Sequence, residues 1–236
     1  MATDLATTDH LLRTQWLRLR EWLEDLDDDA TAAPSVVPGW TVAELVAHLG
    51  RVMDAVAVTQ PADDDARPIS LGAYLALTAE RAERIDTVTR ELAQQIAADP
   101  LGALDRHAED AFAQLQVLRA LGPDPVVRTR VAEIRLSDLA LSRLLELVVH
   151  GDDLDRSLPA QPGDIVVDEA LQVVSDALLE IVTDRGGWEL EVVEPRAWVR
   201  LACGRTPVDA DAIGAAVRPR YTSDSMPDLA GMLPLV

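Results

Sequence analysis

Glu146 and His150 stand one helical turn apart in an apolar segment and could bind a divalent metal ion together. Residues four positions apart project from the same face of an α-helix, so a carboxylate oxygen and an imidazole nitrogen at this spacing point toward one site. Zinc accepts both kinds of ligand. Arg143 and Asp153 fall on the same stripe of that helix. The spacing predicts that Glu146 and His150 are two ligands of a metal ion, with further polar groups beside them.

The same stripe has a simpler interpretation, in which these four side chains form ordinary ion pairs on a solvated helix face. Apolar residues nevertheless occupy more than half of the helical circumference, which favours burial on several sides. A buried Glu–His pair needs a partner, because an unpaired buried charge costs on the order of several kcal/mol. A divalent cation compensates both groups at once.

His48 is the candidate for a third ligand. It lies in a second predicted helix, on the border between the apolar and the polar face, where a histidine is more often hydrogen-bonded at the edge of the core than bound to a metal. His10 and His107 have no carboxylate at chelating spacing within an apolar setting and are interpreted as surface residues. Two histidines and one carboxylate would leave a coordination position open, which is typical of catalytic zinc. Such a metal lowers the pKa of a bound water or thiol.

Helices must position these side chains. Apolar periodicity, caps and breaker residues predict helices over about 5–26, 42–58, 70–98, 104–121, 137–156 and 168–184. Thr41 and Glu44 form a capping box with Trp40 as the hydrophobic staple, and Ser137 is the predicted N-cap of the helix that carries Glu146. Residues 126–134 favour β-structure, and the alternating runs 188–193 and 197–202 predict a hairpin.

The fold class predicted from these elements is mainly α. Residues 1–160 contain helices almost throughout, which indicates a helical bundle, whereas residues 161–236 mix a helix with short strands and predict a small C-terminal α+β domain. Prolines and glycine at 159–163 mark the border.

Composition narrows the classes of partner. The 236 residues carry a net charge of −20, which repels phosphate backbones and anionic lipids, so neither nucleic acid nor a membrane is expected as a partner. No stretch approaches the roughly 18 apolar residues of a membrane span, and the start of the chain lacks the pattern of a signal peptide, so a cytoplasmic location is expected. Cys203 is the single cysteine, so thiolate chemistry in the helical domain would need an external thiol. Homodimerisation stays open.

Two segments carry a family resemblance. Residues 37–50 read VPGWTVAELVAHLG and residues 143–154 read RLLELVVHGDDL. Together they resemble the mycothiol-dependent maleylpyruvate isomerase family, which is related to the DinB-like metalloproteins, and the resemblance covers about residues 5–158. The segment 201–205 and the LPL ending resemble the C-terminal domain of the same family.

The resemblance implies a DinB-like four-helix bundle that binds a divalent metal, usually zinc, through His48, Glu146 and His150. It also implies mycothiol, a low-molecular-weight thiol of actinobacteria, as cofactor, and a small electrophilic or dicarboxylate substrate. The absence of Lys and Asn resembles a GC-rich bacterial genome and fits that source. The named activity isomerises maleylpyruvate to fumarylpyruvate by addition and elimination of the thiol, and other members are thiol S-transferases.

The resemblance gives roles to three further residues. Asp153 would orient His150 or act as an acid or base, with an acid on the surface near the helix C-terminus as the alternative. Arg143 could bind a substrate carboxylate or pair with Glu146. Arg205 could bind cofactor or substrate, or cap a turn.

Three functions therefore stay open. The first is a metal-dependent enzyme that uses mycothiol for isomerisation or S-transfer, which needs a three-ligand site. The second is a non-catalytic binding or regulatory module braced by its metal, which needs a fourth protein ligand such as Asp153. The third is a helical interaction protein without metal.

Overall fold

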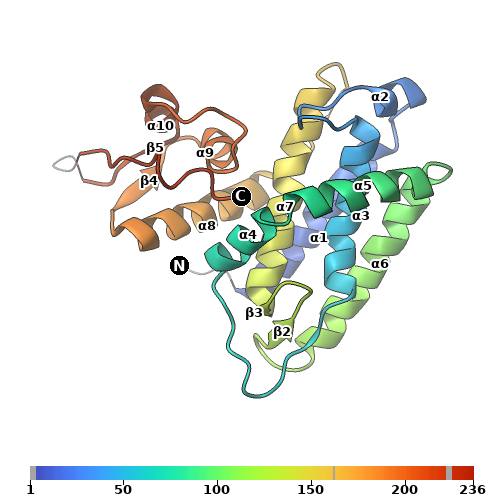
Figure 1. The fold of residues 1–236 in the computed structure, drawn as a ribbon, viewed down its shortest axis with the longest axis horizontal. Coiled ribbons are helices and arrows are strands. Elements are labelled where there is room, and N and C mark those ends of the chain that lie inside the picture. Colours follow the sequence, from blue (N-terminus) through green and yellow to red (C-terminus); the bar gives the residue numbers. More distant parts are fainter. Residues whose placement is uncertain (1–3, 162, 222–224) are drawn as a thin grey trace. The chain divides into compact units, whose positions relative to one another are not determined.

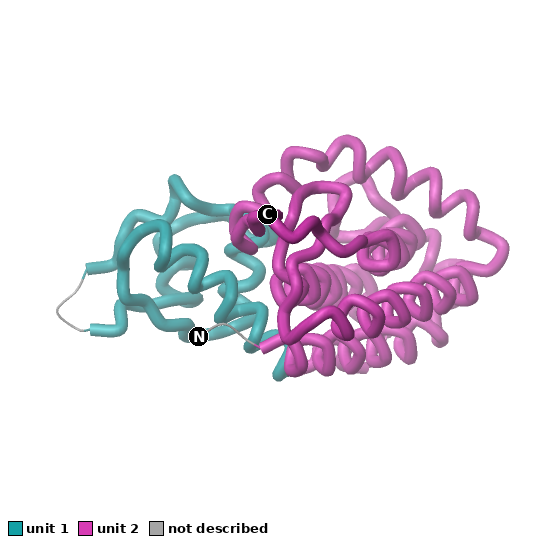
Figure 2. The backbone as a smooth tube through the Cα atoms, turned by 90° about the horizontal axis from the view of Figure 1, so that it is seen from below, with its two compact units in different colours: residues 1–2, 168–236 teal, residues 3–167 magenta. Residues whose placement is uncertain are grey.

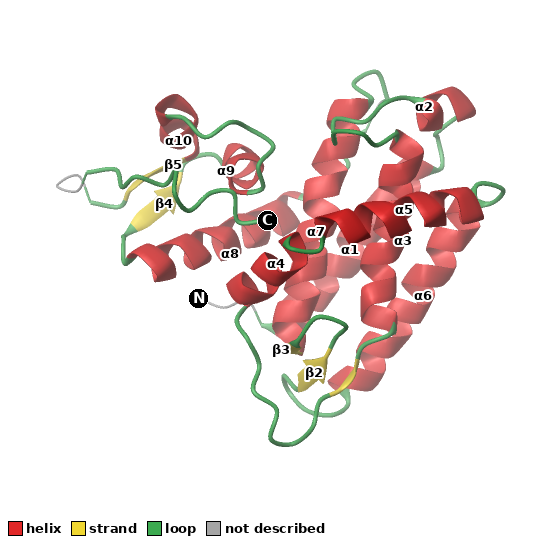
Figure 3. Ribbon diagram, viewed as in Figure 1, coloured by secondary structure: helices red, strands yellow, loops and turns green. Residues whose placement is uncertain are grey.

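A computed structural model describes residues 4–161, 163–221 and 225–236, and helices predominate in them (Figures 1 and 3). The helices are α1 (Leu5–Leu23), α2 (Asp28–Ala32), α3 (Val42–Ala57), α4 (Leu71–Ala79), α5 (Ala82–Ile96), α6 (Pro100–Arg119), α7 (Leu136–Ser157), α8 (Asp168–Gly186), α9 (Pro195–Ala202) and α10 (Ala210–Ala216). The strands are β1 (Gln60–Pro61), β2 (Val126–Arg128), β3 (Glu133–Arg135), β4 (Leu190–Val192) and β5 (Val217–Pro219). The predicted mainly helical class is confirmed.

The chain divides into two compact units, drawn in different colours in Figure 2. The first unit is Thr3–Val167 and contains α1 to α7, and the second contains Asp168–Val236. The sequence placed a domain border at residue 160, whereas the first unit runs on to Val167. Among the helices of the described residues, none has both the length and the apolar character needed to cross a membrane.

Helix α7 is the centre of the first unit. It packs against α1 and α3, and 16 of its 22 residues are buried. Helix α3 in turn packs against α5 and α6. The prediction that the helix carrying Glu146 is covered on several sides is confirmed, because even its charged stripe lies inside the unit.

The N-terminus of α7 is set by a small antiparallel sheet of order β1-β2-β3. Val127 and Ile134 are opposite each other in β2 and β3 and are fully buried, so the predicted β-structure over 126–134 is confirmed. The predicted N-cap at Ser137 is wrong, because α7 begins directly after β3. Asp124 accepts hydrogen bonds from the Ser137 amide and hydroxyl, at 2.9 and 3.0 Å, and so performs the capping role from outside the helix.

Gln15 ties the end of the first unit to α1. Its side chain is fully buried, its amide donates to the Ile165 carbonyl at 2.8 Å, and its carbonyl accepts from the Val167 amide at 2.9 Å. This side chain pairs with the backbone as a neighbouring strand would, so two buried peptide groups without a strand partner are satisfied.

Three predicted helix boundaries were wrong. The helix predicted over 70–98 is two helices, because α4 packs against α7 and α5 packs against α3, and one straight helix would not present both faces. The segment 99–102, interpreted as a helix end, starts α6 instead, with Asp99 accepting from the Gly102 amide and Pro100 in the first turn. The first helix ends at Leu23 rather than at residue 26.

The hairpin predicted in the second unit was also wrong. Residues 195–202 form α9, because Glu194 accepts hydrogen bonds from the first helical amides and Pro195 favours the first turn. Strand β4 pairs with β5 instead. Trp198 of α9 is fully buried and donates to the Ser175 carbonyl at 3.1 Å, so the apolar positions taken for a strand line one side of a helix.

Candidate metal centre

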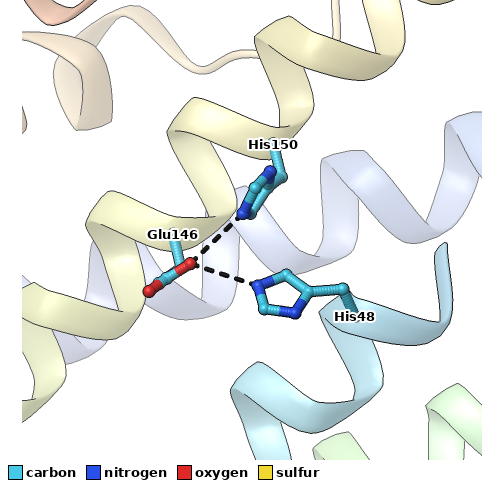
Figure 4. Close-up of side chains that lie close together, drawn as sticks. All are labelled: His48, Glu146 and His150. Carbon is cyan, nitrogen blue, oxygen red and sulfur yellow. Dashed lines mark hydrogen bonds and ion pairs between the residues drawn. The ribbon is translucent and has the colours of Figure 1, made fainter. Parts of the chain in front are cut away.

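Two helices bring three metal-binding side chains together (Figure 4). His48 lies on α3, whose N-terminus has the predicted capping box: Thr41 and Glu44 each accept from the other's backbone amide. Glu146 and His150 lie one turn apart on α7 and point toward His48. The structure thus places side by side the three residues that the sequence singled out.

The donor atoms have the spacing that a small metal ion requires. The Nε2 atoms of His48 and His150 each lie 3.3 Å from Oε2 of Glu146, and the three ligand atoms fall within 4.8 Å of one another. Two ligands bound about 2.0–2.1 Å from a tetrahedral zinc ion are about 3.3–3.4 Å apart. The two histidines are buried and the side chain of Glu146 is 18% exposed. The donor set and its spacing therefore fit zinc or a similar divalent ion.

Burial and hydrogen bonding set the charge of each ligand. Burial, helped by the charges of His150 and Arg51, lowers the pKa of His48 to about 4, although the hydrogen bond with Glu146 opposes this shift. Burial alone would raise the pKa of Glu146, but hydrogen bonds with both histidines outweigh it and hold that pKa well below its usual value. Burial also opposes the charged form of His150, yet hydrogen bonds to Asp153 and Glu146 raise its pKa. Glu146 is thus an anion between two imidazoles.

Asp153 lies on the far side of His150 from Glu146. Its Oδ2 is 3.0 Å from His150 Nδ1, whereas Glu146 contacts Nε2 of the same ring. Asp153 is completely buried, so the interpretation as a surface acid is wrong. A carboxylate at Nδ1 fixes the tautomer that leaves Nε2 available to a metal, and it makes the imidazole a stronger ligand.

Arg143 places a buried positive charge beside the cluster. Its side chain is 7% exposed and its NH2 group lies 4.0 Å from Oε1 of Glu146, the oxygen that neither histidine contacts. Its Nε donates to the Ser142 hydroxyl at 3.2 Å. The guanidinium is therefore close to Glu146 and still beyond hydrogen-bond distance of it.

Other predicted polar residues lie elsewhere. Arg205 belongs to the second unit and donates to the Cys203 carbonyl at 2.9 Å, so its role toward a cofactor stays a prediction. His10 is exposed, as predicted. His107 is half-buried rather than on the surface, because α3 and α6 approach each other closely at Gly50, where an added Cβ would lie 3.2 Å from the His107 ring.

Two residues make contacts with His48 that the sequence did not indicate. Trp40 has its ring centroid 5.2 Å from that of His48, and its predicted role as a hydrophobic staple stays a prediction. Thr89 of α5 is fully buried, with its hydroxyl 3.5 Å from His48 Nδ1. No spacing rule links residue 89 to residue 48, so the sequence offers no signal for this contact.

Asp153→Asn tests the contact with His150. The amide keeps the shape of the side chain but removes its charge, so we expect zinc affinity to fall about 10-fold or more. The measurement is competition with a chromophoric chelator. Asp155→Asn, two residues further along α7, is the control and should bind zinc as the wild type does. Equal affinity for both variants would contradict the role of Asp153.

The fold and the site together define a helical-bundle protein with a candidate divalent metal centre of two histidines and a glutamate. More particularly, the chain belongs to the family described as the mycothiol maleylpyruvate isomerase N-terminal domain, which matches residues 12–155, more than half of its length. The matched region includes all three residues of the cluster.

Solved structures similar to this chain include the crystal structure of the mycothiol-dependent maleylpyruvate isomerase, at 19% identity and a TM-score of 0.45, and that of a histidine-to-alanine mutant, at 18% and 0.44. Both alignments cover 86% of this chain and 90% of the other. No protein of curated function matches the sequence.

Proposed function

We propose that this protein is a metal-dependent enzyme that uses mycothiol to isomerise a cis double bond, or to transfer the thiol to a small electrophile. The observation that carries the proposal is the contact of both histidine Nε2 atoms with one oxygen of Glu146, at 3.3 Å each. His48, Glu146 and His150 would hold the metal, most suitably zinc. The bound ion would keep a thiol deprotonated near neutral pH.

The position of Asp153 favours the enzyme over a protein that the metal merely braces. A bracing metal needs a fourth protein ligand, and Asp153 was the candidate. It contacts Nδ1 of His150, the nitrogen that faces away from Glu146, and is thus occupied in orienting a ligand. Three protein ligands leave room for an exogenous thiol or substrate.

The residues around the cluster suit a substrate with a carboxylate. Arg143 offers a buried guanidinium that Glu146 engages only at 4.0 Å. A guanidinium in this state can bind a carboxylate in bidentate fashion. The proposed substrate is therefore a small unsaturated carboxylate or dicarboxylate, and the runner-up is an electrophile that accepts the thiol.

The proposed isomerisation balances without a further reactant. Mycothiol, when bound, would supply a thiolate that adds to one alkene carbon, with the electron pair taken up by the neighbouring carbon next to the carbonyl, and that leaves again after rotation about the single bond to give the trans alkene. In this proposal Arg143 holds the substrate carboxylate while the rest of the substrate rotates about the new single bond.

The thiol in this proposal comes from outside the chain. Cys203, the single cysteine, is buried in the second unit. A reduced external thiol suits the cytoplasm, which is the location we propose. The net charge of −20 gives no support to nucleic acid or anionic membranes as partners.

The test is an assay of the protein with maleylpyruvate and mycothiol, run in parallel with a panel of electrophiles. We expect fumarylpyruvate, or a mycothiol conjugate, to form only when both metal and thiol are present. Chelation should abolish the activity and zinc should restore it. Arg143→Met should raise KM for a carboxylate substrate about 10-fold or more, because it removes the cationic partner and keeps an unbranched side chain. Turnover that survives chelation, or that does not need mycothiol, would overturn the proposal.

A further inference from the structure

Helix α5 reaches the candidate metal centre through one side chain. Thr89 is the only residue of α5 that is buried among the described residues, and its exposed fraction is 0%. Its hydroxyl lies 3.5 Å from Nδ1 of His48, at the long end of the hydrogen-bond range. Nδ1 is the ring nitrogen that faces away from Glu146, which contacts Nε2.

The hydroxyl of Thr89 behaves unlike those of other helical threonines in the chain. Thr14, Thr78 and Thr87 each donate to the carbonyl of the residue four positions earlier in the same helix, at 2.9–3.0 Å. This local bond is the usual one for threonine inside a helix. Within the described residues, the hydrogen-bond partner of the Thr89 hydroxyl is the His48 ring of α3 instead.

A network of charged groups holds α5 in this position. Arg90, the next residue, donates to Glu44 of α3 at 2.7 Å and to the Gly39 carbonyl at 2.7 Å. Its Nε also donates to both oxygens of Asp86, at 3.1 Å each. One guanidinium thus fastens α5 to the start of α3 and to the loop before it.

Trp40 connects this network to His48. Its indole N–H donates to Asp86 at 2.6 Å, and its ring lies against His48, with centroids 5.2 Å apart and planes inclined by 51°. His48 is therefore held by an aromatic ring from the loop before α3 and by a hydroxyl from α5. These contacts leave its Nε2 directed at Glu146.

We propose that Thr89 is the positioning residue of His48, which it keeps oriented for metal binding through Nδ1 with a hydroxyl that can both donate and accept. This inference rests on the proposed metal centre. A hydroxyl accepts from Nδ1–H when Nε2 binds a metal, and it donates to Nδ1 when Nε2 carries the hydrogen and bonds Glu146. An ionised Asp153 carboxylate can only accept a hydrogen bond from Nδ1 of His150. The Thr89 hydroxyl, in contrast, can accept a hydrogen bond from Nδ1 of His48 or donate one to it.

The experiment compares four proteins: wild type, Thr89→Val, Thr89→Ser and Thr87→Val. Valine keeps the shape of threonine and removes the hydroxyl, whereas serine keeps the hydroxyl. Thr87→Val removes a hydroxyl from the exposed side of the same helix, where the Thr87 hydroxyl donates to the Glu83 carbonyl one turn earlier. Each protein is stripped of metal, and its zinc affinity is measured by competition with a chromophoric chelator. Cobalt(II) absorption reports the geometry of the site.

We expect Thr89→Val to bind zinc about 10- to 100-fold more weakly than the wild type and to shift the cobalt spectrum. Thr89→Ser and Thr87→Val should bind zinc within about threefold of the wild type, a spread well below the expected effect of the lost hydroxyl. Circular dichroism and thermal unfolding verify the fold, and Thr89→Ala is a second variant without hydroxyl should valine not be accommodated.

Two outcomes would overturn this inference alone, and a third would overturn the proposed function as well. Equal zinc affinity in wild type and Thr89→Val would show that the hydroxyl does not position His48. Weak binding by Thr89→Ser as well would assign the effect to packing of the methyl group. If the wild type itself binds no metal, the proposed function fails together with this inference. The first two outcomes overturn this inference alone and leave the proposed function unaffected.

Discussion

Replacing Glu146 by glutamine should abolish stoichiometric zinc binding while the helical fold remains. Both histidines contact the same oxygen of this side chain, so the change affects both of these contacts at once. Glutamine has nearly the shape of glutamate, but its amide carries no charge to offset a divalent ion in a buried site. We expect zinc affinity to fall at least 100-fold, or about 2.7 kcal/mol.

The measurement is the ratio of metal to protein by elemental mass spectrometry, on protein purified without an affinity metal and dialysed against trace zinc. His48→Ala tests the ligand from the other helix and should lose the ion as well. Glu91→Gln removes the same charge from an exposed position on α5 and should retain about one ion per chain. A full complement of metal in Glu146→Gln would refute the assignment of the ligand.

The second large effect concerns the stability of the helical unit. Gln15→Met should lower the free energy of unfolding by about 2–5 kcal/mol, because the Ile165 carbonyl and the Val167 amide would both be buried without a partner. Methionine fills a similar volume, so the loss reports the two hydrogen bonds rather than a cavity.

Urea unfolding followed by circular dichroism measures this change, which should shift the midpoint at constant slope. Gln94→Met, on the exposed side of α5, is the matched control and should change the free energy of unfolding by less than about 0.5 kcal/mol. A variant as stable as the wild type would mean that these peptide groups find other partners.

The candidate metal ligands could be found from the sequence because their signals are local. Glu146 and His150 share a helix at chelating spacing, and the capping box of Thr41 and Glu44 fixes where the helix of His48 begins. Apolar residues around most of α7 indicated that its charged stripe would be covered, as it is. Each of these features depends on residues a few positions apart.

Features that depend on packing between distant elements could not be predicted. The break between α4 and α5 accompanies their packing against different helices, and Thr89 contacts His48 from the second of these helices. Gln15 meets its two backbone partners 150 and 152 positions further along the chain. The helix α9 is different, because Glu194 and Pro195 are a local start signal for a helix, although the alternating pattern of the residues after them favours a strand.

His48 and Glu146 are separated by 98 positions in the chain. Glu146 and His150 come together as soon as one turn of α7 forms, but the third donor arrives only when α3 docks on that helix. An ion held by all three donors would therefore act late on the folding pathway. It would slow the separation of α3 from α7 without speeding their encounter. Metal-loaded protein would therefore unfold more slowly, while its folding rate would stay the same.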